Sequence, residues 1–282
     1  MTVPFWKTVS VGNDFVLVRS EDVEGSELVE LARWACRKKF GIGSDGLLVV
    51  DSHAERPSLR MFNPDGTEDF CGNGLRCAAL FLRRGGGADR FVIRHGGKDV
   101  PVGFEKAGWI DVQLPPASWA PEDVPLAPGV GEVFLRQFDV DGESLTVSAL
   151  STGTAHTVVE LDSPPPDDLF DRLSPKIEVH PWFPERTSVL WTWPEGKCGV
   201  RARVWERGVG ETDGCGTGSA AIAAVRFRKA TETGGPSAGE KAIAVLTNGG
   251  ETAVGRGPAG SLIVSARAEI RYEGAFDWPP RP

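Results

Sequence analysis

The sequence lacks any apolar run that approaches the roughly 18 consecutive residues of a membrane-spanning helix. Its first ten residues hold one lysine and no long apolar stretch, which is not the pattern of a secretion signal. Basic residues form no stripe or cluster, and a net charge of −8 with a pI near 5.2 disfavours nucleic acid and anionic membranes as partners. We therefore expect a cytoplasmic protein that binds neither a membrane nor nucleic acid.

Cysteine and histidine are scarce, with five and four residues. An odd number of irregularly spaced cysteines in a chain of 282 residues does not describe a disulfide scaffold, so reduced thiols are expected. The paired spacings of a zinc site and the lysine of a phosphate-binding loop are also missing. We expect no metal and no cofactor. Three cysteines are interpreted as small buried apolar residues: Cys36, Cys77 and Cys198.

The other two cysteines stand in a repeated pattern. Cys-Gly-x-Gly occurs at residues 71–74 and again at 215–218, and the offset 215 − 71 = 144 lays residues 59–74 over 203–218 without a gap. The same offset lays residues 41–47 over 185–191, and an offset of 141 lays 12–16 over 153–157. A single long duplication in a chain of this length predicts two related domains with a site between them.

Both halves predict the same order of elements. In the first half we expect strands around a loop at residues 11–14, a helix from Ser26 to about residue 39, strands at 46–50 and 59–62, and a helix at 74–83. The second half repeats this order, with a short helix at 167–173 and an alanine-rich helix from 218 to about 229. The proline-rich residues 115–131 are predicted to be the linker. The fold class is α+β (α/β), with a first domain of residues 1–116 and a second of 117–264.

Cys71 and Cys215 are therefore predicted to begin helices. A helix N-terminus offers N–H groups and a positive partial charge, which lower the pKa of a thiol and bind an anion beside it. Two such thiols on opposite faces of one molecule form a two-base racemase, in which one removes a Cα proton and the other returns a proton to the opposite face. A redox pair, or a thiol-based redox sensor, is the alternative from a different class of function.

The motifs around these cysteines resemble those of the diaminopimelate epimerase family over nearly the whole chain. The matching segments are residues 12–15, 41–46, 62–66, 71–76, 206–212 and 215–218. The resemblance implies two pseudo-symmetric domains, each a mostly antiparallel, β-barrel-like sheet around a central helix, with a last strand at about 265–282 returning to the first domain. It implies cofactor-independent conversion of LL-diaminopimelate to the meso form, with Cys71 and Cys215 as the two bases.

The resemblance also implies the substrate-binding residues. The reacting carboxylate would be held by Gly72, Asn73, Gly216 and Thr217, with Asn13 near it, and the distal amino-acid end by Asn63, Glu206 and Arg207. His156 and Glu211 are expected to support the site without touching the substrate. A small amino acid is the expected partner, and a homodimer is a possible assembly.

Two positions depart from the family pattern. Thr154 and Ser188 stand where the family has asparagine, so two contacts with the distal end of the substrate are altered. Their hydroxyl groups can bond the substrate directly or through water. A racemase of another amino acid, such as histidine or lysine, is therefore the alternative to an enzyme for diaminopimelate.

Overall fold

The computed structural model describes residues 1–53, 56–196, 199–233 and 240–279, and the chain divides into two compact units. Unit 1 comprises Met1–Val112 and Ala266–Pro282, and unit 2 comprises Gln113–Ser265. Cys198 lies outside the described residues. Within the described residues, no helix combines the length and the apolar character that crossing a membrane requires.

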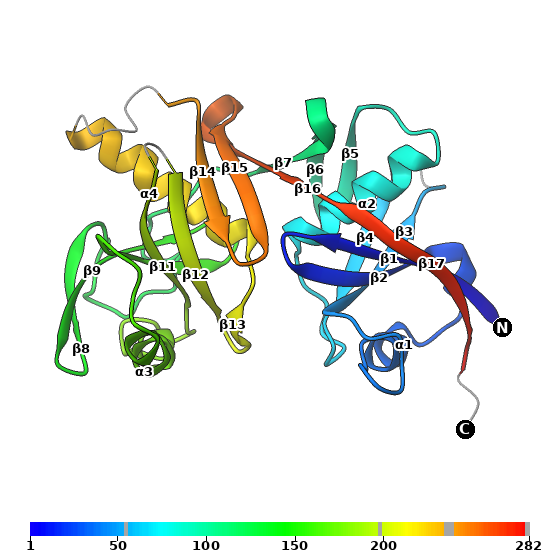
Figure 1. Ribbon diagram of the computed structural model, residues 1–282, viewed down its shortest axis with the longest axis horizontal. Coiled ribbons are helices and arrows are strands. Elements are labelled where there is room, and N and C mark those ends of the chain that lie inside the picture. The colour runs from blue at the N-terminus through cyan, green and yellow to red at the C-terminus, as the bar shows by residue number, and fades with distance from the viewer. Residues whose placement is uncertain (54–55, 197–198, 234–239, 280–282) are drawn as a thin grey trace. The chain divides into compact units, whose positions relative to one another are not determined.

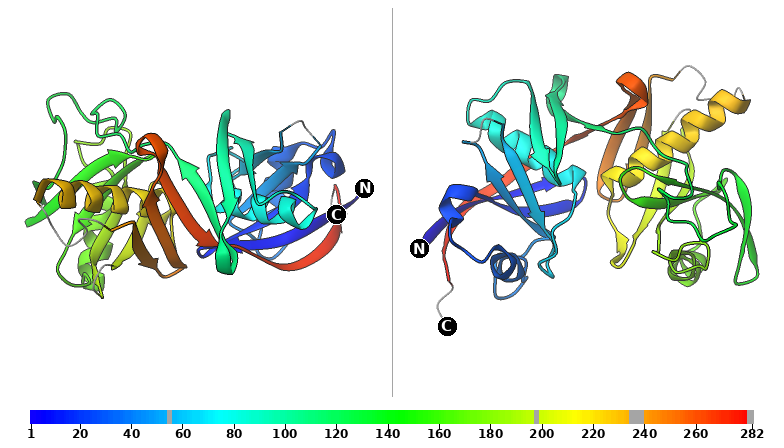
Figure 2. Two further views of the ribbon diagram at one scale, coloured as in Figure 1. Left: turned by 90° about the horizontal axis from the view of Figure 1, so that it is seen from above. Right: turned by 180° about the vertical axis from the view of Figure 1, so that it is seen from behind.

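Unit 1 is built around helix α2, which contacts strands on several sides (Figure 1). The pairings of its described strands follow the order β17-β1-β2-β3-β4-β5-β6-β7, and β2–β3 and β4–β5 are the parallel pairs. The last strand, drawn in red, runs antiparallel beside the first, drawn in blue (Figures 1 and 2). The elements are β1 (Thr2–Ser10), β2 (Asn13–Arg19), α1 (Leu28–Ala35), β3 (Gly46–Asp51), β4 (Ser58–Phe62), α2 (Gly72–Arg84), β5 (Arg90–His95), β6 (Lys98–Phe104), β7 (Trp109–Leu114) and β17 (Glu269–Asp277).

Unit 2 repeats this plan around helix α4. Its described strands pair in the order β8-β9-β10-β11-β12-β14-β15-β16, and β10–β11 and β12–β14 are again the parallel pairs. The elements are β8 (Arg136–Val140), β9 (Glu143–Ser151), β10 (Ala155–Glu160), α3 (Asp167–Glu178), β11 (Ser188–Glu195), β12 (Gly199–Glu206), β13 (Gly210–Thr212), α4 (Gly216–Thr233), β14 (Ala242–Thr247), β15 (Gly250–Arg256) and β16 (Leu262–Arg267). Short 3₁₀ turns lie at Ser20–Val23, Lys106–Gly108 and Pro258–Gly260.

The strand register corrects the gapless alignment of the two halves. In unit 1 Leu48 packs beside α2 and pairs with Leu17, whereas in unit 2 Leu190 packs beside α4 and pairs with Val158. Equivalent residues therefore differ by 158 − 17 = 141 in the first of these strands and by 190 − 48 = 142 in the second. The offset of 141 at residues 12–16 is confirmed, and the offset of 144 at residues 41–47 is wrong.

At the next strand, the sequence offset between equivalent residues of the two units grows by one more residue. Leu48 also pairs with Met61 and Leu190 with Val204, so β4 and β12 differ by 204 − 61 = 143, one less than the cysteines. Each connection from β10 to α4 is thus one residue longer than its counterpart in unit 1. As a result Asn63 is equivalent to Glu206. The backbone carbonyl of each closes its turn: that of Asn63 accepts the Gly66 N–H at 2.9 Å, and that of Glu206 accepts the Val209 N–H at 3.0 Å.

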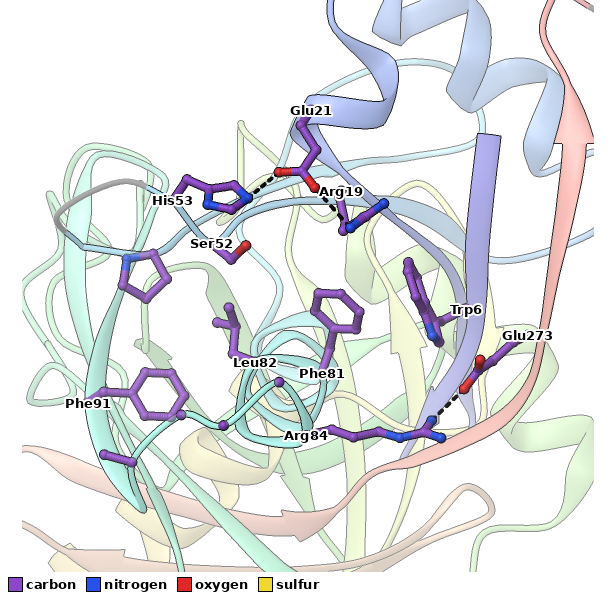
Figure 3. A pocket seen from close by; sticks show the side chains of 15 residues that line it. Trp6, Arg19, Glu21, Ser52, His53, Phe81, Leu82, Arg84, Phe91 and Glu273 are labelled. Atoms are coloured by element: carbon purple, nitrogen blue, oxygen red, sulfur yellow. Dashed lines mark hydrogen bonds and ion pairs between the residues drawn. The ribbon is translucent and has the colours of Figure 1, made fainter. Parts of the chain in front are cut away.

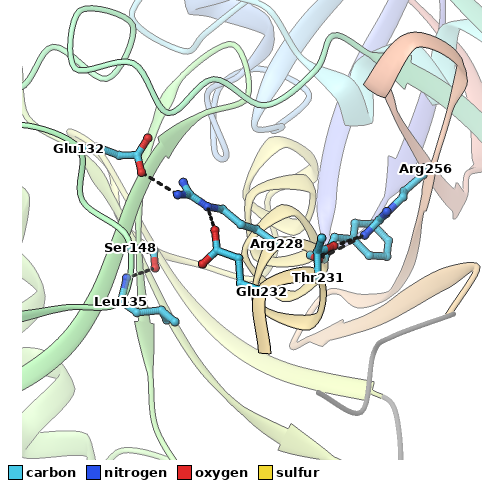
Figure 4. A network of polar contacts seen from close by, with 8 residues as sticks. Glu132, Leu135, Ser148, Arg228, Thr231, Glu232 and Arg256 are labelled. Atoms are coloured by element: carbon cyan, nitrogen blue, oxygen red, sulfur yellow. Dashed lines mark hydrogen bonds and ion pairs between the residues drawn. The ribbon is translucent and has the colours of Figure 1, made fainter. Parts of the chain in front are cut away.

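The proline-rich residues 115–131 pack on unit 2, although we expected a linker there. Val124 is a buried member of the core of unit 2, and the backbone at Ser118 exchanges two hydrogen bonds with Ser151. Just beyond, Arg228 on α4 binds Glu132 at 2.7 Å (Figure 4). Its guanidinium also stacks over the ring of Phe134. Proline removes donors but not apolar contacts, so the segment packs without regular structure.

Helix α3 extends beyond the predicted end at residue 173. Pro175 lies inside it, and the hydroxyl of Ser174 bonds to the carbonyl of Phe170 at 2.7 Å. Leu173 and Ile177 are fully buried on either side of the proline. Their packing outweighs the hydrogen bond that proline removes.

Each unit has its own apolar core, and that of unit 2 includes Phe138. Its ring lies 4.9 Å from Trp182 and 6.4 Å from Phe183, centre to centre, and is 1% exposed. Replacing Phe138 by alanine should lower the free energy of unfolding by about 3–5 kcal/mol, because the truncation leaves a cavity. Urea denaturation followed by circular dichroism measures this. The matched control is Val179→Ala, which removes an exposed side chain, and an equal loss in both variants would contradict the prediction.

Candidate functional site

Cys71 occupies the N-cap of α2. Its Sγ accepts a hydrogen bond from the Gly74 N–H at 3.2 Å, and its carbonyl accepts the first intrahelical bond, from Leu75, at 3.0 Å. The N–H groups of Gly72 and Asn73 belong to the first turn, where a helix has no internal acceptor for them. They therefore form a position for an anion beside the sulfur.

Cys215 repeats these contacts at the start of α4. Its Sγ accepts the Gly218 N–H at 3.4 Å, and its carbonyl accepts a bond from Ser219 at 2.9 Å. Gly216 and Thr217 take the places of Gly72 and Asn73. Among the four cysteines of the described residues, Cys71 and Cys215 are partly exposed, whereas Cys36 and Cys77 are buried. The structure thus bears out the interpretation of Cys36 and Cys77 as buried residues.

The second glycine of both Cys-Gly-x-Gly motifs has a packing reason. A Cβ on Gly74 would lie 2.9 Å from the Cδ2 of Leu48 and 3.5 Å from the sulfur of Cys71. A Cβ on Gly218 would lie 3.0 Å from Leu190 and also 3.5 Å from its cysteine sulfur. Glycine therefore lets the helix start pack against the neighbouring strand without displacing the leucine, while the sulfur lies at ordinary contact distance.

His95 supports the backbone of Cys71. Its Nε2 accepts the Cys71 N–H at 2.9 Å, so its Nδ1 carries the proton and donates it to the carbonyl of Leu59 at 2.9 Å. Burial lowers the pKa of His95, which favours this neutral form. No sequence motif indicated this role, because His95 lies 24 residues away on β5.

A buried polar network orders the half-site in unit 1. Asn73 donates through its amide to the side-chain oxygen of Asn13 and accepts a bond from Arg76. Arg76 is fully buried and also donates to Ser10 at 3.0 Å, and Ser10 donates to the carbonyl of Arg267 at 2.9 Å. The structure thus brings Asn13, Gly72 and Asn73 together around Cys71, and it adds Ser10 and Arg76.

Unit 2 has the same contact in other residues. Thr154 is equivalent to Asn13 (154 − 13 = 141) and Thr217 to Asn73 (217 − 73 = 144), and their hydroxyls lie 3.5 Å apart. Thr154 also contacts the Nε2 of His156 at 3.0 Å, and Thr217 contacts the sulfur of Cys215 at 3.3 Å. Thr154 therefore reaches the cysteine through one intervening hydroxyl.

Glu206 sets the electrostatics of Cys215. Burial raises the pKa of the Cys215 thiol well above its usual range, and the negative charge of Glu206 raises it further. Bonds to the sulfur from Thr217 and Gly218 act in the opposite direction. The Glu206 carboxylate also accepts a bond from Thr212 at 2.7 Å. The thiol form of Cys215 is thus favoured in this half-site.

The remaining predicted residues lie on the hairpins before the cysteines. Arg207 is exposed, and its N–H donates to the hydroxyl of Ser188 at 3.1 Å. Asn63 donates to Thr67 at 3.1 Å on the equivalent hairpin of unit 1. Glu211, which we expect to support the site, forms a two-bond ion pair with Arg203, at 2.9 and 3.1 Å.

A cavity of about 740 Å³ lies in unit 1 at the opposite end of α2 (Figure 3). Phe81 and Leu82 line it from the last turns of the helix, and neither repeated cysteine is among its lining residues. Its charged groups pair with one another, as in the contact between Arg84 and Glu273 at 2.5 Å. This cavity is therefore separate from the half-site at Cys71.

His156 makes the stability of the protein dependent on pH. Its ring is buried, its Nδ1 has no hydrogen-bond partner among the described residues, and burial together with the charge of Arg207 lowers its pKa to about 3. The unfolded chain binds this proton below about pH 6.5. Between these values the unfolded chain holds more protons, so the free energy of unfolding falls as the pH falls.

The variant His156→Phe tests this, because Phe15 occupies the equivalent position in unit 1 (156 − 15 = 141). Between pH 7 and pH 4.5 the native protein should lose about 2–3 kcal/mol more stability than the variant. Urea titrations of both proteins at each pH measure the difference. Parallel pH profiles would contradict the assignment.

Comparison with known proteins agrees with this geometry. The family model described as diaminopimelate epimerase matches residues 5–119 and 148–262. The diaminopimelate epimerase of Psychrobacter cryohalolentis is 32% identical over 98% of this chain and 94% of its own length. That of Moorella thermoacetica is 38% identical over 78% of this chain and 81% of its own.

Solved structures share the fold at low sequence identity. A phenazine biosynthesis protein of the PhzF family from Bacillus anthracis superposes with a TM-score of 0.66 at 17% identity, covering 98% of this chain and 99% of that one. A hydroxyproline epimerase from Agrobacterium vitis gives 0.67 at 13%, covering 98% and 91%. These neighbours confirm the expected two-domain α/β fold. The family model and the relatives above show that the chain belongs to the diaminopimelate epimerase family and is an isomerase of the epimerase and racemase class.

Proposed function

We propose that this enzyme interconverts LL-diaminopimelate and meso-diaminopimelate without a cofactor, using Cys71 and Cys215 on opposite faces of one Cα. The observation that carries the proposal is the duplicated half-site. Each unit holds one partly exposed cysteine at a helix N-terminus, with the sulfur bonded to the N–H three residues on. Membership of the diaminopimelate epimerase family supports this substrate.

The reaction needs one thiolate and one thiol. The thiolate takes the Cα proton, so the C–H bond breaks and an S–H bond forms, while the electron pair spreads into the carboxylate. The second thiol then gives its proton to the opposite face of Cα, which restores a C–H bond in the inverted configuration. Protons and electrons balance without an oxidant or a reductant.

The two helix N-termini are proposed to hold the carboxylate as charge develops on it. The donors are the backbone N–H groups of Gly72, Asn73, Gly216 and Thr217. One donor aimed at a developing oxyanion contributes about 2.7–4 kcal/mol, whereas a helix dipole contributes about 0.3–2 kcal/mol. The aimed N–H groups therefore supply most of the stabilisation. Asn13, fixed by Asn73, adds a side-chain contact on the same side.

The distal end of the substrate carries a second carboxylate and ammonium. Arg207 is suited to the carboxylate because its planar guanidinium can donate two bonds, and Glu206 is suited to the ammonium. Asn63, at the turn position equivalent to that of Glu206, completes this set. Diaminopimelate is a precursor of lysine and peptidoglycan, so we place the enzyme in that synthesis in the cytoplasm, as a monomer or a homodimer.

A racemase of another amino acid, such as histidine or lysine, is the second candidate. The hydroxyls of Thr154 and Ser188 replace the asparagine amides of the family pattern, and both already bond to protein groups, His156 and the Arg207 backbone. These contacts fix the two side chains in place, and a hydroxyl has one donor where an amide has two, so fewer donors remain for a distal carboxylate. The reaction type does not depend on this difference.

Exchange in heavy water tests the mechanism and the substrate together. The native enzyme should incorporate deuterium at Cα of diaminopimelate with inversion, and not at Cα of histidine or lysine. Cys71→Ala and Cys215→Ala should each slow inversion by about 10²- to 10⁴-fold, the usual contribution of a general acid or base. Cys36→Ala is the control with native activity. Full inversion in either site variant would refute the two-base mechanism, and exchange of histidine or lysine alone would favour the second candidate.

Restoring the family residue at Ser188 tests the distal contacts. Ser188→Asn should raise the ratio of kcat/KM for diaminopimelate to that for lysine by roughly 10- to 100-fold, because a hydrogen bond to a charged group contributes about 1.5–3 kcal/mol. Ser144→Asn on the β8–β9 hairpin is the matched control and should leave the ratio unchanged. An equal ratio in both variants would show that position 188 does not meet the distal carboxylate.

A further inference from the structure

The two half-sites repeat their backbone but differ in charge on the helix. Arg76 is equivalent to Ala220 (220 − 76 = 144). The Arg76 side chain is fully buried, and its guanidinium is held towards the N-terminus of α2 by Asn73, in the first turn, and by Ser10. A positive charge is thus fixed beside the turn that Cys71 caps, and α4 carries only a buried methyl group at this place.

The second difference is on the hairpin. Asn63 and Glu206 occupy equivalent turn positions, as the shared i-to-i+3 bonds show. Glu206 places a negative charge close enough to Cys215 to act on its thiol. Asn63 is neutral. Both differences therefore favour the same distribution of charge: a thiolate is stabilised in unit 1, and a thiol in unit 2.

The other ionisable groups on the hairpins match between the units. Arg60 and Glu68 form a two-bond ion pair at 3.0 and 2.8 Å, as Arg203 and Glu211 do at 2.9 and 3.1 Å. Asp69 and Asp213 are both exposed and both precede their cysteine by two residues. These groups act equally on the two thiols.

The remaining ionisable groups near the two thiols add little to the difference in charge between the half-sites. His95 and Cys77, which lie near Cys71, are both held neutral by burial. Lys7 pairs with Asp14 at 2.5 Å, and burial favours the neutral form of the adjoining Asp45. In unit 2 the pKa of His156 is lowered, and Arg207 is exposed to solvent, which screens its charge.

We propose that Arg76 and Glu206 set the resting protonation of the enzyme, with Cys71 as the thiolate and Cys215 as the thiol. This inference rests on the proposed function, in which the pair shares one proton. Arg76 acts as a positioning residue for charge and does not touch the substrate. The free enzyme is then ready to remove a proton only from the face of Cα that meets Cys71, so it selects one stereoisomer for the first turnover.

Site-resolved alkylation of the full-length protein tests the assignment without substrate. Iodoacetamide reacts with thiolates, so labelling of each cysteine is followed from pH 5 to pH 10 by peptide mass spectrometry, and the midpoint of each profile is compared. We expect the Cys71 midpoint at least about two pH units below that of Cys215. Midpoints are used because labelling rates also depend on exposure.

Three variants separate charge from structure. Arg76→Met should raise the Cys71 midpoint by about one pH unit or more, and Arg76→Lys, which keeps the charge, should restore it. Glu206→Gln should lower the Cys215 midpoint and shift that of Cys71 by less, because the two thiols are coupled. Arg90→Met, at an exposed arginine on β5 of unit 1 that pairs with Glu105, is the control with native midpoints. If Arg76→Met does not fold, Arg76→Lys and Glu206→Gln still decide the question.

Equal or reversed midpoints in the native enzyme would overturn the assignment, as would equal Cys71 profiles in Arg76→Met and Arg76→Lys. The outcome is separable from the choice of substrate, because no amino acid is present. If the enzyme inverts diaminopimelate but its two midpoints are reversed, only this inference is refuted. If the native enzyme shows the expected midpoints but exchanges no Cα proton, only the proposed function is refuted.

Discussion

The cysteine that caps its own helix is the interaction on which both half-sites depend. In each unit the sulfur accepts the N–H three residues on, so the thiol is fixed at the end of a row of aligned peptide dipoles. This contact favours glycine at Gly74 and Gly218, because a Cβ there would crowd the leucine of the adjoining strand. The helix must therefore lie close against the middle of its sheet, and the repeated strand order around α2 and α4 provides that support.

The duplication has kept the backbone contacts and exchanged the side chains. The same contact joins Asn73 to Asn13 in unit 1 and Thr217 to Thr154 in unit 2. The first pair uses side-chain amides and the second uses hydroxyls. The first pair is tied to a buried arginine, and the second to a buried neutral histidine. Two halves that descend from one plan can thus perform different parts of one reaction. A racemase needs this difference, since one base must be ionised while the other is protonated.

Much of the site was predictable from the sequence, because Cys71, Cys215 and their glycines recur in an ordered motif and carry local backbone chemistry. The turn at Asn63 and the helix starts follow from the same short-range rules. The predictions that failed concern residues that lie far apart in the sequence. The gapless offset hid the equivalence of Asn63 and Glu206, since one-residue insertions in loops leave no periodic signal. His95 reaches Cys71 only through strand pairing. The helix expected from Ser26 to about residue 39 spans only Leu28–Ala35, and its N-cap, Glu27, makes no side-chain bond. The packing of residues 115–131 depended on tertiary contacts that composition does not report, such as Val124 in the core of unit 2 and Trp119 under Arg228 of α4.

The pairing of β17 with β1 has a consequence for biosynthesis. In unit 2 the equivalent outer strand, β8, directly precedes β9, whereas in unit 1 this place is filled by the last strand of the chain. A ribosome therefore releases every element of unit 2 before it releases the strand that covers the open side of β1. Until then β1 presents an unpaired edge, the kind of surface that recruits foreign strands. The half that is translated first is completed only after unit 2, so the nascent chain has to protect that edge while the whole of unit 2 is synthesised.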